Sequence, residues 1–193
     1  MATGAGKTRT VIALADVLMR ANWAKRVLFL ADRVALVKQA VNAFKAHLPE
    51  AVPVNLVTDK AAEGRVYVST YPTMMGLINE ARDEKAGGQR RFGVGHFDLI
   101  VVDEAHRSIY QKYRAIFGYF DALLVGLTAT PKDEIDRNTY SLFGLESGVP
   151  TDAYGLDDAI AEGYLAPPKA ISVPLKFQRQ GIRYDDLSDD EKE

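Results

Sequence analysis

The chain has 193 residues, of which 47% are hydrophobic, and its formal net charge is -2. This length accommodates one α/β domain with a short extension, and the near balance of charge argues against a tail-type nucleic-acid binder, which carries a strong basic excess. Cysteine is absent, which excludes disulfides and thiolate metal sites. Neither a long apolar run nor a signal-peptide pattern is present in the sequence, so we expect no membrane partner and a cytoplasmic location.

Short apolar, β-rich runs alternate along the chain with stretches of helical spacing. In chain order, the predicted elements are helix Lys7–Arg20, strand Val27–Ala31, helix Val34–His47, strand Val54–Val57, strand Val66–Ser69, helix Thr73–Arg82, strand Leu99–Val102, helix Tyr110–Phe117, strand Leu123–Leu127, helix Lys132–Leu142, helix Leu156–Glu162 and strand Ala170–Val173. Strands joined by helix-length connections are typical of βαβ units. The pattern therefore predicts an α/β fold with a mostly parallel sheet.

A change of composition divides the chain near residue 150. Gly, Ser and Pro gather at residues 144–152, and the last ten residues are strongly acidic. Such stretches are typical of boundaries and solvated tails. We therefore expect one domain over residues 1–150, followed over residues 151–193 by a connector with an acidic tail.

A glycine-rich loop, Ala-Thr-Gly-Ala-Gly-Lys-Thr at residues 2–8, opens the first predicted helix. Glycines let backbone N–H groups turn toward phosphate oxygens, and the helix N-terminus adds positive charge. We predict that Lys7 contacts the β- and γ-phosphates of ATP and that the Thr8 hydroxyl binds Mg²⁺. The predicted nucleotide-binding residues are Thr3, Gly4, Ala5, Gly6, Lys7, Thr8 and Arg9. The alternative is a glycine turn that only caps a helix.

Two carboxylates, Asp103 and Glu104, directly follow the buried run Leu99–Val102. In open α/β sheets, ligands bind at the carboxyl ends of parallel strands. Asp103 is predicted to hold Mg²⁺, directly or through water, and Glu104 to orient and activate the attacking water. An acidic pair after a strand is by itself more often a solvated turn or a helix cap. The glycine-rich loop upstream makes a functional role for the acidic pair the favoured interpretation.

Residues 126–131, Gly-Leu-Thr-Ala-Thr-Pro, follow the next apolar strand. The hydroxyls of Thr128 and Thr130 can form hydrogen bonds to the acidic pair, and we expect them to couple the nucleotide site to a bound nucleic acid. His106 is predicted to relay the nucleotide state. On its own, the Thr-Ala-Thr-Pro sequence is only a strand end followed by a helix start.

The order of the motifs resembles superfamily 2 of helicases and translocases. The motifs are Ala-Thr-Gly-Ala-Gly-Lys-Thr, Val-Leu-Phe-Leu-Ala-Asp-Arg, Val-Ser-Thr-Tyr, Asp-Glu-Ala-His and Leu-Thr-Ala-Thr-Pro. Met-Ala-Thr-Gly-x-Gly-Lys-Thr-Arg-Thr, Leu-Ala-Asp-Arg and Asp-Glu-Ala-His-Arg-Ser resemble, more narrowly, the motor (R) subunit of type I restriction enzymes and its "res subunit" relatives. The resemblance implies a RecA-like P-loop NTPase domain, with helices on both faces of its sheet, that is the first of two motor domains.

The resemblance also implies roles and partners. Arg33, Ser69 and Thr70 match positions that touch the nucleic-acid backbone without reading sequence. An ordinary cation at a helix start is the alternative for Arg33. The implied partners are DNA, a second RecA-like domain whose arginines reach the γ-phosphate, and the methyltransferase and specificity subunits of a restriction complex. No strand precedes the phosphate loop and no second motor domain follows, so we expect a chain truncated at both ends.

Three functions are compatible with these residues. The leading one is the ATP-binding domain of an ATP-dependent DNA translocase, part of a restriction endonuclease, which hydrolyses ATP to move along duplex DNA. The others are a strand-separating DNA or RNA helicase of another branch and a non-catalytic nucleotide-binding remnant. A second RecA-like domain in the downstream reading frame would distinguish a fragment from a standalone protein.

Overall fold

The computed structural model describes residues 1–79, 90–104, 107–129 and 137–169. The predicted strand Ala170–Val173 lies outside these ranges, as do the predicted coupling residues His106 and Thr130. Within the described ranges, no helix is both long enough and apolar enough to cross a membrane.

The centre of the fold is a parallel sheet of five strands in the order β2-β3-β1-β4-β5. The strands are β1 (Val27–Ala31), β2 (Pro53–Asn55), β3 (Val66–Thr70), β4 (Leu99–Val102) and β5 (Leu123–Gly126). Every residue of β1, β3 and β4 is buried, because helices cover both faces of the sheet. The register pairs Phe29 of β1 with Val68 of β3 on one side and with Val101 of β4 on the other.

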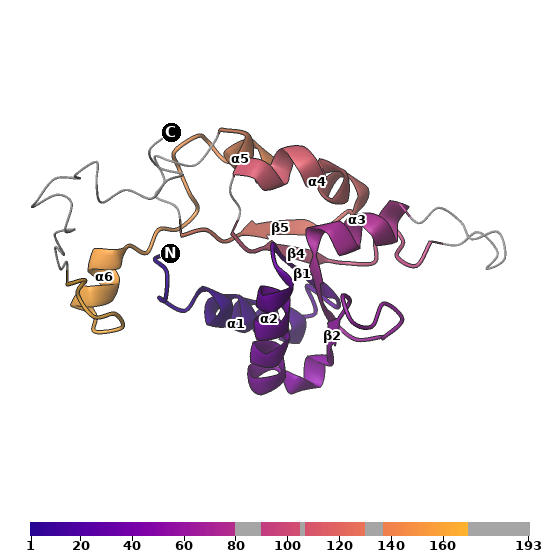
Figure 1. The fold of residues 1–193 in the computed structure, drawn as a ribbon, viewed down its shortest axis with the longest axis horizontal. Coiled ribbons are helices and arrows are strands. Elements are labelled where there is room, and N and C mark those ends of the chain that lie inside the picture. The colour runs from indigo at the N-terminus through magenta and orange to yellow at the C-terminus, as the bar shows by residue number, and fades with distance from the viewer. Residues whose placement is uncertain (80–89, 105–106, 130–136, 170–193) are drawn as a thin grey trace, which may run out of the picture.

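Helices lie on both faces of the sheet, as Figure 1 shows. The helices are α1 (Lys7–Arg20), α2 (Val34–His47), the short 3₁₀ helix η1 (Pro49–Ala51), α3 (Tyr71–Asn79), α4 (Arg107–Tyr119), α5 (Arg137–Leu142) and α6 (Leu156–Ala161). Helices α1 and α2 cover one face and share a hydrophobic cluster with it, whereas α3 and α4 pack on the other. The predicted α/β fold with a parallel sheet is confirmed.

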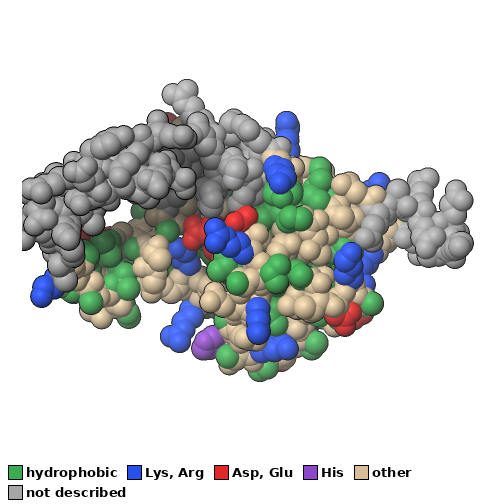
Figure 2. All heavy atoms as spheres, in the orientation of Figure 1, with side chains coloured by type: hydrophobic (Ala, Val, Ile, Leu, Met, Phe, Trp, Pro, Cys, Tyr) green, Lys and Arg blue, Asp and Glu red, His purple; other side chains and the backbone are tan. Residues whose placement is uncertain are grey.

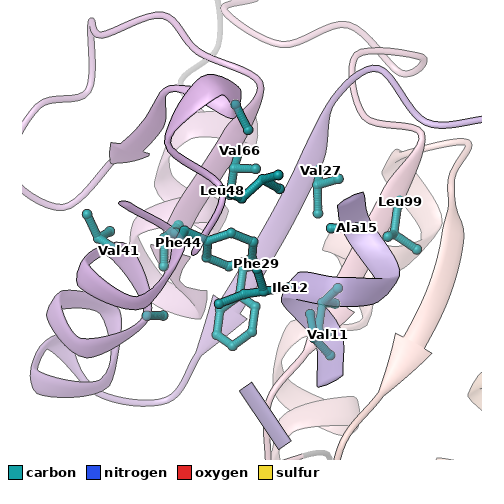
Figure 3. Close-up of a cluster of buried hydrophobic side chains, with 14 of the residues drawn as sticks. Val11, Ile12, Ala15, Val27, Phe29, Val41, Phe44, Leu48, Val66 and Leu99 are labelled. Atoms are coloured by element: carbon teal, nitrogen blue, oxygen red, sulfur yellow. The ribbon is translucent and has the colours of Figure 1, made fainter. Parts of the chain in front are cut away.

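The cluster under α1 and α2 fixes the position of the glycine-rich loop relative to the sheet. Ile12 of α1 lies beside Phe29 of β1 in this cluster, and the Phe29 ring packs edge-on against Phe44 of α2, with centroids 5.9 Å apart (Figure 3). Complete burial of such a side chain contributes about 1.5–3 kcal/mol. This packing holds the start of α1 at the carboxyl end of the strands.

The structure starts α3 two residues before the predicted start at Thr73. Thr70, the last residue of β3, provides the reason, because its Oγ1 accepts the backbone N–H of Thr73 at 3.3 Å. A threonine in this position caps the free N–H groups of the first helical turn. The chain therefore passes from β3 into α3 without a loop.

One edge of the sheet carries exposed apolar residues. In the described part of the chain, β5 pairs only with β4, and Leu123 of β5 is 62% exposed. A mostly apolar cavity of about 390 Å³ lies beside β5, lined by residues that include Leu14 of α1 and Phe143. The amino group of Met1 donates to the carbonyl of Thr128 at 3.2 Å, just beyond the end of β5.

Candidate functional site

The glycine-rich loop adopts a conformation that its two glycines make possible. Gly4 and Gly6 have φ angles of 83° and 96°, in the left-handed region that other residues rarely adopt. Gly6 is the N-cap of α1, so the first free N–H groups of this 14-residue helix face the loop. The segment after residue 150 lies against the loop, because the N–H of Ala2 donates to the carbonyl of Tyr154 at 2.9 Å.

The acidic pair lies next to the loop, at the carboxyl end of β4. The N–H of Asp103 donates to the carbonyl of Leu30 in β1 at 2.9 Å, which extends the sheet by one residue. Lys7 Nζ lies 3.5 Å from Glu104 Oε1, and the Lys7 side chain is only 11% exposed. The structure thus brings together residues that are far apart in sequence and were both predicted to act on ATP.

Glu104 has a left-handed backbone with a φ of 52°. Its N–H donates to Oδ1 of Asp103 at 3.1 Å, which ties the two carboxylate residues together. A non-glycine residue in this region costs of order 1–3 kcal/mol unless its surroundings hold it, and such residues gather at functional sites. The conformation therefore makes this turn a candidate functional site.

Burial and charge act on Asp103 in opposite directions. Burial raises the pKa of its carboxyl group, and the neighbouring Glu104 charge raises it further, whereas Lys7 and the N–H of Glu104 lower it. Burial dominates, so the pKa lies above the ordinary value of 3.8. A cation near Asp103 would reverse this shift.

A cavity of about 310 Å³ opens between α1 and α2 beside the acidic pair. Thr8, Arg9 and Asp103 all line it. A hydroxyl and a carboxylate are the oxygen ligands that Mg²⁺ prefers, and a cationic guanidinium suits a phosphate group. The donor set of the loop and this cavity therefore fits a nucleotide with its magnesium ion.

The predicted nucleic-acid residues have different surroundings. The Arg33 side chain is 81% exposed, and its Nε lies 3.6 Å from Oδ2 of Asp32, so it is free to exchange that partner for a phosphate. Ser69 and Thr70 are buried. Their hydroxyl groups bond to the Thr70 carbonyl and to Thr73 Oγ1, so in this conformation they organise the start of α3.

Basic side chains do not form a single broad patch on the face that Figure 2 shows. The Lys and Arg side chains of the described residues are spread over that face. Scattered basic residues bind phosphates weakly. Binding of nucleic acid by this domain alone would therefore depend on a few local contacts. The contacts predicted for Arg33, Ser69 and Thr70 stay predictions.

The sequence analysis missed a role for Tyr71. Its hydroxyl donates to the carbonyl of Asp103 at 3.3 Å, so a residue that follows the Ser69–Thr70 pair touches the acidic turn. The sequence placed Tyr71 at the end of the Val-Ser-Thr-Tyr motif but did not predict its contact with the acidic turn. Of the predicted coupling residues, Thr128 lies within the described part of the chain, just beyond the end of β5.

A parallel sheet with helices on both faces, a glycine loop that opens α1 and an acidic pair after β4 define a RecA-like P-loop NTPase domain of the superfamily 2 type. The family model described as "Type III restriction enzyme, res subunit" matches residues 1–133. The chain belongs to this family.

Similar proteins agree with this assignment. The endonuclease subunit of the type I restriction enzyme EcoAI from Escherichia coli is 34% identical over 189 residues, which cover 95% of this chain and 22% of that protein. The helicase domain of Hef from Pyrococcus furiosus is 27% identical, with a TM-score of 0.54 over 75% of this chain and 32% of that one.

A third similar protein is a nuclease-deletion mutant of the type ISP restriction-modification enzyme LlaGI, solved with a DNA substrate mimic. It has a TM-score of 0.58 at 20% identity, over 85% of this chain and 18% of that one, and this likeness shows the fold alone. The chain spans about a fifth of the length of the EcoAI subunit.

Proposed function

We propose that this chain is the ATP-binding domain of an ATP-dependent DNA translocase that works within a type I restriction endonuclease. The observation that carries the proposal is the pairing of Lys7, from the glycine loop, with Glu104, from the acidic turn, across 3.5 Å. The cation that would bind phosphate and the carboxylate that would activate water thus meet in one place. The family and the EcoAI relative support the restriction assignment.

The Lys7–Glu104 pair suggests how binding prepares hydrolysis. ATP phosphates would compete with Glu104 for the Lys7 ammonium group and would draw it toward the loop. Glu104 would then be released from its partner, and its carboxylate would accept a proton from the attacking water as a general base. Asp103 and Thr8 would hold Mg²⁺, which supplies the charge that neutralises the phosphate oxygens.

Partners of the longer protein are part of the same proposal. A second RecA-like domain would follow the boundary near residue 150 and would bring arginines to the γ-phosphate, an addition worth about 10³–10⁵ in rate in P-loop enzymes. Duplex DNA, with methyltransferase and specificity subunits, would complete a restriction complex. Because the proposed substrates are ATP and DNA, a cytoplasmic location is part of the proposal.

The test is a titration of the chain with a fluorescent ATP analogue and Mg²⁺. We expect Lys7→Ala to abolish binding, because the variant lacks the cation of the loop. Lys45→Ala is the matched control, since it removes an exposed lysine of α2, and it should bind as the wild type does. Equal binding by all three proteins would refute a nucleotide site at this loop and would favour a glycine turn that only caps α1.

Hef offers a second candidate function, since its helicase domain is 27% identical with a TM-score of 0.54. In that case the longer protein would separate strands instead of moving along an intact duplex. A strand-displacement assay on a forked duplex, beside a triplex-displacement assay on a blunt duplex, distinguishes the two. The leading proposal predicts triplex displacement without strand separation.

A further inference from the structure

The side chain of Tyr71 joins the start of α3 to the acidic turn after β4. Tyr71 is completely buried, and the bond from its hydroxyl to the carbonyl of Asp103 spans 3.3 Å in space and 32 residues in sequence. Tyr71 also follows Thr70 directly, at the point where β3 ends and α3 begins. One side chain therefore connects the segment predicted to face nucleic acid with the segment predicted to activate water.

This contact holds one end of a particular peptide unit. The carbonyl between Asp103 and Glu104 accepts the Tyr71 hydroxyl, while the N–H of the same unit donates to Oδ1 of Asp103. Rotation of this unit would change the φ angle of Glu104, which is 52° and thus in a rarely occupied region. Hydrogen bonds at both ends oppose that rotation, so they stabilise the left-handed conformation of Glu104.

The surroundings of Tyr71 keep its hydroxyl in place. Its ring stacks on that of Tyr113 in α4, with centroids 5.3 Å apart and an interplanar angle of 21°. Burial raises the pKa of Tyr71 far above its ordinary value of 10.0, and the charges of Asp103, Asp32 and Glu104 raise it further. The stacked ring therefore directs the hydroxyl toward the acidic turn.

We propose that Tyr71 is a positioning residue for Glu104. Its hydroxyl fixes the Asp103–Glu104 peptide unit so that the Glu104 carboxylate points to Lys7 and the glycine loop. A displacement of the start of α3 would reach Glu104 through this hydrogen bond. The effect on turnover rests on the ATPase function proposed above, whereas the effect on the conformation of Glu104 does not.

The variant Tyr71→Phe removes the hydroxyl and keeps the ring that stacks on Tyr113. A matched control exists in Tyr119→Phe, because the Tyr119 hydroxyl likewise donates to a backbone carbonyl, that of Phe92, at 2.6 Å. NMR on the chain without nucleotide measures the Cα chemical shift and the HN–Hα coupling of Glu104, which report its φ angle. Tyr71→Phe should move both values away from those of a left-handed residue, and Tyr119→Phe should leave them unchanged.

Unchanged Glu104 values in Tyr71→Phe, or equal changes in both variants, would overturn the proposal. The amide spectrum of each variant shows directly whether it is folded. Steady-state ATP hydrolysis adds a second measurement, in which Tyr71→Phe should lower kcat about tenfold with KM unchanged, the size of effect that one lost hydrogen bond produces. If the chain hydrolyses ATP too slowly to measure without the arginines of a second motor domain, the NMR values alone decide the role of Tyr71.

Discussion

The ammonium group of Lys7 and the carboxylate of Glu104 lie 3.5 Å apart, so each partly neutralises the other. ATP binding therefore requires the exchange of one partner of Lys7 for another. A partly exposed ion pair of this kind contributes about 0.2–1 kcal/mol. This free energy is small compared with that of binding a triphosphate, so the ion pair would weaken nucleotide binding only slightly. It does hold the Glu104 side chain beside Lys7 before ATP binds.

Replacement of Glu104 should separate binding from hydrolysis. Glu104→Gln keeps the shape of the side chain but removes the base and the charge that holds Lys7. We expect nucleotide affinity to stay the same or to rise by up to about fivefold, since Lys7 is released. Hydrolysis should fall by about 10²–10⁴, the usual contribution of a general base. Fluorescence titration and a phosphate-release assay measure the two effects, and a loss of binding equal to that in Lys7→Ala would contradict the assigned role.

Arg33 is expected to contact the phosphate backbone of DNA. Arg33→Ala should weaken binding about equally on unrelated duplexes and lower the salt slope by roughly one unit. Arg20→Ala is a suitable control, because Arg20 is also exposed and also pairs with an aspartate, Asp16, at 2.8 Å. Titrations at two salt concentrations on two duplexes provide the measurement. Sequence-selective weakening would contradict a contact with the phosphate backbone. A change in stability with no effect on DNA binding would show that Arg33 is an ordinary helix-start cation.

Asp103 should make the stability of the fold depend on pH. Because its pKa is raised above 3.8, the folded chain holds this proton more tightly than the unfolded chain does. Stability is therefore lost as the pH rises from 3.8 through the raised pKa. Asp103→Asn removes the buried charge, so it should unfold at a higher temperature than the wild type at neutral pH. Below pH 3.8 the difference should vanish.

Circular dichroism at several pH values measures this difference, and Mg²⁺ with ATP offers an independent check. Ligands that bind only the folded state raise its stability, so Mg²⁺–ATP should stabilise the wild type more than Asp103→Asn. A variant that is less stable than the wild type at neutral pH without nucleotide would contradict the dominance of burial at Asp103.

Asp98 has a structural role at the opposite end of the sheet. Its Oδ2 accepts the N–H groups of Lys25 and Arg26, at 2.8 and 2.9 Å, and so ties the start of β1 to the start of β4. Asp98→Ala should cost about 2 kcal/mol, since hydrogen bonds to a charged group are stronger than neutral ones. Urea unfolding measures the loss. Asp59→Ala, which removes two backbone contacts within one exposed loop, should cost less, and equal losses would contradict the long-range role of Asp98.

The sequence predicted those parts of the fold whose pattern is local. The bounds of β1, β4, α1 and α2 coincide with the predicted ones, because an apolar run or a 3.6-residue period continues without interruption. The start of α3 was misplaced, since the cap that Thr70 provides depends on one hydroxyl group. The glycine loop and the acidic pair lie close together because parallel strands end at a common edge of the sheet, as the sequence pattern indicated.

Other features of the site depend on contacts that no local pattern encodes. The bond between Tyr71 and Asp103 joins residues in different βα units, and the left-handed Glu104 depends on that turn's surroundings. The burial of Ser69 and Thr70 follows from the helices that cover the end of β3, whereas the motif alone suggested a surface role. Long-range packing thus decided which of the predicted polar residues face solvent.

The outer edge of β5 has a practical consequence for the behaviour of this chain in concentrated solution. A strand edge that carries exposed apolar residues is a template for pairing with another chain. Among the described residues, β5 pairs only with β4, and Leu123 of β5 is 62% exposed. Purified material should therefore self-associate as its concentration rises, and light scattering should detect this before any loss of fold. A charged residue blunts such an edge, so Leu123→Lys should keep the chain monomeric at concentrations where the wild type precipitates.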